Sequence, residues 1–169
     1  MRFPTAPLCL LGWALVGCQV APVVPRDALE ALVDAAAAGE RPDPHAWVDP
    51  ADPARAAAFL QVERWVNVNA EAVTDVRAAG LPVEPGHRFA RSADGRFVYV
   101  FTAGWPGRQL RTKAVQPWPG SSVRVLGWPE DLRWEQLGAV CVVETPRELA
   151  DEENHPCEQV FVFRLQVAR

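Results

Sequence analysis

The chain has 169 residues and a formal net charge of −4, with 17 basic and 21 acidic side chains. A mildly acidic chain is a poor partner for nucleic acid and for anionic lipid surfaces. Its length suits one domain built around one hydrophobic core.

The start of the chain predicts export. Residues 8–16 form an apolar run without charge, which is typical of a signal peptide and too short to span a bilayer. The run leads into Leu-Val-Gly-Cys at 15–18. This tetrapeptide resembles the lipobox of bacterial lipoproteins, so we expect residues 1–17 to be a signal peptide.

The resemblance implies that Cys18 carries lipid and that the membrane is a partner of the chain through this residue. Gln19 stands where some bacteria use an aspartate to retain lipoproteins in the inner membrane. By this resemblance we expect the protein to be anchored in the outer membrane, with its domain facing the periplasm. Residues 18–26 contain Pro22 and Pro25, and we expect them to be a lipidated tether.

Residues 27–169 are predicted to form a single α+β domain that begins with two helices. The first runs from Asp27 until Gly39 stops it. Its apolar face is formed by Leu29, Leu32, Val33 and Ala36. The second begins at Pro53, after an aspartate N-cap, and is expected to reach about Ala79.

The loop between these helices, at 40–53, carries acidic side chains and one histidine. They are Asp43, His45, Asp49 and Asp52. Carboxylates and imidazole can hold a metal, but prolines separate these residues and no ligand spacing recurs. We interpret the loop as a solvated connection and predict no metal and no cofactor.

From residue 87 the apolar period changes to two, which predicts strands. The expected strands lie at 87–91, 96–102, 122–127, 138–144 and 158–168. An Asp-Gly dipeptide at 94–95 predicts a hairpin between the first two, and a helical turn is expected at 130–136. Both faces of 96–102 are apolar, so this strand should be central. The predicted fold is two N-terminal helices packed on an antiparallel sheet of four or five strands.

Cys141 and Cys157 are the cysteines that remain beyond the predicted lipidation site. An even pair in an exported domain predicts a disulfide, worth ~3 kcal/mol in the chain-entropy model. The alternative is two free or metal-binding thiols, although this spacing, with His155 nearby, is a poor zinc pattern.

Three Trp-Pro pairs stand at strand ends or in loops. Tryptophans on one rim can stack on sugar rings or on a partner's apolar side chains; the alternative is that they cover the ends of the core. A basic segment lies between the first two pairs. The candidate binding rim consists of Trp105, Trp118, Trp128, Arg108, Arg111 and Lys113.

No motif supports catalysis, because none of the three serines lies in a nucleophile elbow and no glycine-rich phosphate loop is present. We therefore predict no catalytic residues and no enzyme. The Gly-x-Pro at 80–82, followed by a strand with Tyr99 and Phe101, resembles in order the outer-membrane assembly lipoproteins of the SmpA/OmlA type. The predicted function is that of a non-enzymatic, lipid-anchored envelope lipoprotein that binds another envelope protein. The alternative is a cell-wall or glycan-binding lipoprotein that binds peptidoglycan through the tryptophan rim.

Overall fold

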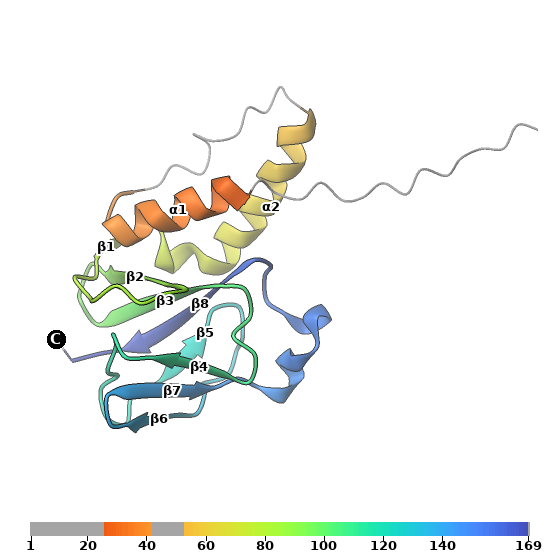
Figure 1. Ribbon diagram of the computed structural model, residues 1–169. Helices are drawn as coiled ribbons and strands as arrows, with labels where there is room; N and C mark the ends of the chain where they lie inside the picture. Colours follow the sequence, from red (N-terminus) through yellow and green to blue (C-terminus); the bar gives the residue numbers. More distant parts are fainter. Residues whose placement is uncertain (1–25, 42–52, 169) are drawn as a thin grey trace, which may run out of the picture.

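The computed structural model describes residues 26–41 and 53–168, and shows three layers (Figure 1). Two helices cover one face of a five-stranded sheet, and a three-stranded sheet covers the other face. The α+β class expected from the sequence is confirmed. Residues 1–17, Cys18, nearly all of the tether and most of loop 40–53 lie outside the described residues, so what we predict for them stays a prediction.

The first helix, α1 (Arg26–Ala38), has the predicted length and the predicted buried face. Its four apolar residues Leu29, Leu32, Val33 and Ala36 are all buried. They pack against the five-stranded sheet together with Trp65 of α2 (Pro53–Asn69). Neither of these helices, as far as the structure describes them, is long and apolar enough to cross a membrane.

The second helix is shorter than predicted, and the expectation that it reaches Ala79 is wrong. It ends at Asn69 and continues only as a 3-10 turn, η1 (Ala70–Ala72). The Asn69 side chain donates to Trp65 O at 2.9 Å, one turn back along the helix. The chain then becomes extended, because β1 (Val76–Ala78) pairs with the strand that follows it. Apolar spacing alone does not reveal that pairing.

The five-stranded sheet is antiparallel throughout, in the order β1-β2-β3-β8-β5. Its other strands are β2 (His87–Ser92), β3 (Phe97–Ala103), β8 (Val160–Gln166) and β5 (Val123–Val125). The predicted hairpin is confirmed, and β3 is central as expected. Its Asp-Gly turn is closed by the Asp94 carboxylate, which accepts from Arg96 N and Ser92 Oγ. These bonds, led by that of the Arg96 amide, hold the pKa of Asp94 well below its usual value.

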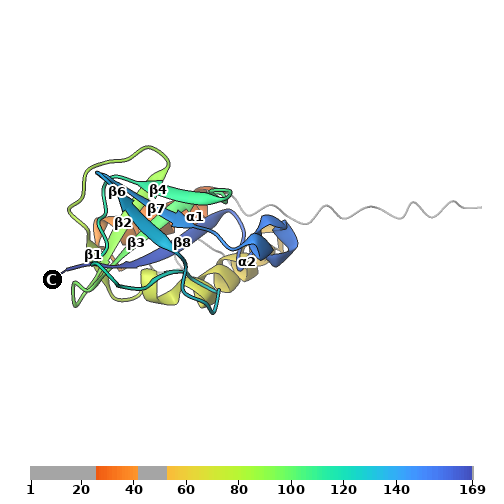
Figure 2. The same ribbon diagram turned by 90° about the horizontal axis from the view of Figure 1, so that it is seen from below.

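A second sheet of three strands, in the order β4-β7-β6, was not predicted from the sequence. They are β4 (Gln109–Thr112), β7 (Val140–Glu144) and β6 (Trp134–Leu137). The helical turn expected at 130–136 is therefore wrong, because residues 134–137 are extended and paired with β7. Figure 2, seen from below, shows this sheet in front of the five-stranded one. Two short 3-10 turns, η2 (Arg147–Ala150) and η3 (Glu152–Asn154), connect β7 to β8.

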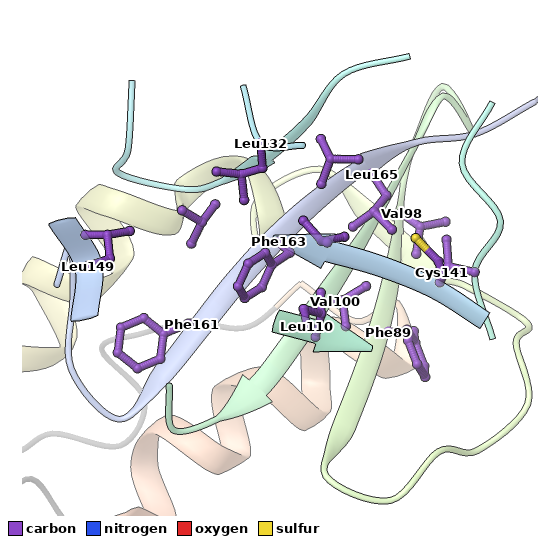
Figure 3. Close-up of a cluster of buried hydrophobic side chains, with 14 residues drawn as sticks. Phe89, Val98, Val100, Leu110, Leu132, Cys141, Leu149, Phe161, Phe163 and Leu165 are labelled. Atoms are coloured by element: carbon purple, nitrogen blue, oxygen red, sulfur yellow. The ribbon is translucent and has the colours of Figure 1, made fainter. Parts of the chain in front are cut away.

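Alternation along the strands divides the core into two compartments. Val98 and Val100 of β3 point toward the three-stranded sheet, whereas Tyr99 and Phe101 point toward the helices. Phe163 of β8 lies in the middle of the compartment between the sheets (Figure 3). A strand that is apolar on both faces is what such a middle layer requires.

The predicted disulfide is not present, because Cys141 and Cys157 are both free thiols. Cys141 points from the middle strand β7 into the compartment between the sheets (Figure 3). Cys157 follows η3, and its thiol donates to Val160 O at 3.2 Å. Burial raises the pKa of each thiol to about 11. Both are therefore protonated at neutral pH, which makes them weak nucleophiles and weak metal ligands.

We expect reductant to leave the melting temperature unchanged, because both thiols are already free. A disulfide that closed this loop would contribute ~3 kcal/mol in the chain-entropy model. Thermal unfolding with and without a non-thiol reductant measures the difference, and unfolding of a Cys157→Ser variant is the control. A fall of several degrees on reduction of the original chain, absent from the variant, would show that the cysteines do pair.

Candidate functional site

A cleft of about 660 Å³ opens between α2 and the segment that enters β8. A volume of this size matches ligand sites, which run from ~300 to ~1,000 Å³. The lining comes from both helices, the loop after β3, and residues 152–161. It consists of Leu29, Gln61, Val62, Arg64, Trp65, Val68, Gly104, Trp105, Glu152, Glu153, His155, Pro156, Cys157, Glu158, Gln159 and Phe161.

The floor of the cleft is fixed by one backbone carbonyl. Val160 O accepts the Trp65 indole N–H at 2.7 Å and the Cys157 thiol at 3.2 Å. Asn69, which is fully buried, donates in turn to Trp65 O. These bonds tie the end of α2 to the start of β8, so the two walls of the cleft are held in register.

An aromatic cluster forms one wall. The Trp105 ring lies 4.7 Å from the His155 ring and 5.0 Å from the Phe161 ring, between centroids. His155 Nε2 lies 3.0 Å from Leu149 O, and because a carbonyl can only accept, Nε2 carries the proton. Trp105 and His155 are half-buried, so part of each ring is exposed at the cleft. The wall is rigid because each ring contacts two others.

A strained turn positions the entrance to β8. Gln159 has a φ of +67°, and it is the one residue other than glycine with a positive φ in the described ranges 26–41 and 53–168. Its carbonyl accepts the Gly104 N–H at 2.6 Å, which closes the end of the sheet beside Trp105. A residue that is not glycine reaches this conformation at a cost of about 1–3 kcal/mol, and such strain is frequent at functional sites.

Charged groups border the cleft unevenly. Glu152, Glu153 and Glu158 lie on the segment that enters β8, and Arg64 lies on α2. All four side chains are exposed. Across residues 28–41 and 59–168, no group of three or more His, Cys, Asp or Glu side chains is arranged to hold a metal ion. The cleft therefore combines aromatic rings with hydrogen-bonding side chains of both charges.

The structure does not bring the three predicted rim tryptophans together. Trp105 and Trp128 stand at the end of the sheet where β8 begins, because Ala103 pairs with Val160 and Leu126 N donates to Val162 O. Trp118 stands at the opposite end, where its amide donates to Gln166 O. Trp105 and Trp128 pack against the core, and only Trp105 lines the cleft.

The predicted basic residues lie on β4 or directly beside it in the chain, and they do not line the cleft. Arg108 precedes the strand, Arg111 lies on it and Lys113 follows it, and all three are exposed. The Lys113 amide donates to the Glu84 carboxylate, which also accepts from Thr112 Oγ1 at 2.5 Å. Burial opposes the ionised form of Glu84, but these bonds together with His87 lower its pKa overall.

Sequence reasoning missed most of the cleft. Apart from Trp105, its lining residues were not predicted as binding residues, and the floor joins positions 95 residues apart in the chain. No local spacing could have shown this. The one available signal was the acidic run near His155, which the strand pattern places in a connection between strands.

The fold is shared with part of known glycosidases. No protein-family model and no curated protein matches the sequence. An alpha-L-fucosidase GH29 from Bacteroides thetaiotaomicron matches 70% of this chain with a TM-score of 0.53 and 20% identity. An alpha-fucosidase from Thermotoga maritima matches 68% with a TM-score of 0.54 and 17% identity. This chain spans about a quarter of the length of these enzymes, 26% and 27% respectively. At such identity the likeness establishes the fold alone.

These comparisons correct the function inferred from the sequence. A non-enzymatic envelope lipoprotein that binds another envelope protein was expected, by analogy with outer-membrane assembly lipoproteins. The similar solved chains are instead fucosidases, so the domain has a fold related to part of a glycoside hydrolase. The earlier inference failed because it rested on the order of helices and strands and did not include the second sheet.

Proposed function

We propose that this chain is a glycosidase-related domain that takes a saccharide in the cleft beside Trp105. The observation that carries the proposal is the composition of that cleft. An exposed part of a rigid tryptophan ring lies among carboxylates, a guanidinium and an amide. Sugar C–H faces pack on such rings, and sugar hydroxyls pair with such polar groups. The fold shared with part of the fucosidases supports the same class of ligand.

The proposal assigns separate roles to the two walls. Trp105, held by His155 and Phe161, offers an apolar surface that does not have to be ordered on binding. Arg64 and the three glutamates offer donors and acceptors from opposite sides. Hydrolysis requires two carboxylates that flank the bond to be broken, one of them acting as an acid. A carboxyl group that acts as an acid lies in apolar surroundings, which keep it protonated. Glu152, Glu153 and Glu158 are exposed and lack such surroundings, so we assign them to binding.

Binding can be followed by tryptophan fluorescence, because Trp65 and Trp105 both line the cleft. A panel of soluble oligosaccharides, with L-fucose and fucosylated sugars among them, is titrated into the protein. We expect a saturable change for at least one sugar, and we expect Arg64→Ala to weaken it about tenfold, the effect of losing one charged hydrogen bond.

Arg108→Ala is the matched control, since Arg108 is also exposed but lies outside the cleft. It should leave the affinity unchanged. The same panel, presented as chromogenic glycosides, tests whether a bound sugar is also hydrolysed. Absence of any fluorescence change at millimolar sugar, or an equal loss in both arginine variants, would refute the proposed site.

A further inference from the structure

Carboxylates outnumber cationic side chains in the lining of the cleft, and several of its donors are engaged within the protein. Three of its donors are already engaged: the Trp65 indole N–H binds Val160 O, His155 Nε2 binds Leu149 O, and the Cys157 thiol binds Val160 O. A ligand cannot use these groups without breaking a bond that holds the floor or the aromatic wall. Arg64 is the cationic side chain of the lining.

The carboxylates of the cleft, in contrast to these donors, are not paired within the described part of the protein. Glu152, Glu153 and Glu158 form no ion pair with any side chain that the structure describes.

We propose that the saccharide taken by this cleft carries a protonated amine, which makes it an amino sugar. This inference rests on the proposed function and names the class of its ligand. An ammonium group supplies three donors and one positive charge, and it offers no acceptor. It therefore matches the three carboxylates of the lining, whereas an acidic sugar would be repelled. Trp105 suits the same ligand, because an aromatic ring face attracts a cation as well as an apolar sugar face.

The test compares two probes that share one sugar backbone, a chitosan tetrasaccharide with free amines and a chitin tetrasaccharide with acetylated ones. Isothermal titration at low salt measures both affinities for the full chain. We expect the amine form to bind at least about tenfold more tightly, and added salt to reduce the difference.

A triple variant, Glu152→Gln with Glu153→Gln and Glu158→Gln, should remove the preference, so that the amine probe binds no more tightly than the acetylated one. All three side chains are exposed, so the fold is kept. The control is Glu135→Gln with Glu144→Gln, an exposed pair on the three-stranded sheet outside the cleft. It should leave the preference intact.

The outcomes separate this inference from the function on which it rests. Equal affinity for the two probes, or a preference that survives in the triple variant, overturns the amino-sugar inference and leaves saccharide binding in place. Binding of another sugar from the oligosaccharide panel, with neither probe bound, overturns it in the same way. If no sugar binds at all, the proposed function is refuted, and the amino-sugar inference that rests on it is refuted as well.

Discussion

Replacing Gly39 by alanine is expected to lower the free energy of unfolding by about 3 kcal/mol. Gly39 ends α1 with a φ of +77°, and its amide and that of Glu40 donate to Ala36 O and Ala35 O. This is a Schellman motif, in which the left-handed residue favours glycine. A Cβ placed there would lie 2.4 Å from the backbone nitrogen of Ala78 in β1, so the helix end and the strand would have to separate.

Gly80→Ala isolates the conformational part of that loss. Gly80 has a similar φ of +64°, but a Cβ at this position meets no atom within 4 Å. It should therefore show only the strain of the left-handed conformation, about 1 kcal/mol. Urea unfolding of both variants measures the two effects side by side. Equal losses would mean that α1 and β1 are not in close contact at Gly39.

The parts of this fold that depend on residues close together in the sequence were predicted correctly. Gly39 stops a helix because its conformation suits few other residues, and the Asp-Gly turn at 94–95 closes a hairpin by bonds within six residues. The apolar character of both faces of β3 correctly placed it at the centre of a sheet. Each of these features depends on neighbours in sequence.

Where the outcome depended on distant pairing, the sequence was ambiguous. Val76 fits a helical stripe as well as a strand, and only the pairing of β1 with β2 decides between them. Residues 134–137 have no strong strand pattern, and they form β6 because they pair with β7. The cleft is the extreme case, because its floor depends on Trp65 reaching Val160. The predicted disulfide failed for a related reason, since the pattern of two cysteines carries no information on where each side chain points.

Phe163→Ala should test the missed sheet most directly, with an expected loss of about 4 kcal/mol in the free energy of unfolding. Phe163 is fully buried between the two sheets, in a cluster that includes Val100 and Leu110 (Figure 3). Removing its ring leaves a cavity that two packed sheets cannot close without shifting their strands.

The matched control is Phe97→Ala, on the neighbouring strand β3. Phe97 is half-buried on the helix side of the sheet, where the guanidinium groups of Arg96 and Arg164 lie 5.5 and 4.9 Å from its ring centroid. Its removal forfeits partial burial and these exposed cation–π contacts, which together are worth about 1–2 kcal/mol. Chemical unfolding of the two variants compares a phenylalanine covered by the second sheet with one that is not. If Phe163→Ala cost no more than Phe97→Ala, the three-stranded sheet would not cover the core as described, and the walls of the cleft that rest on β8 would lose their support.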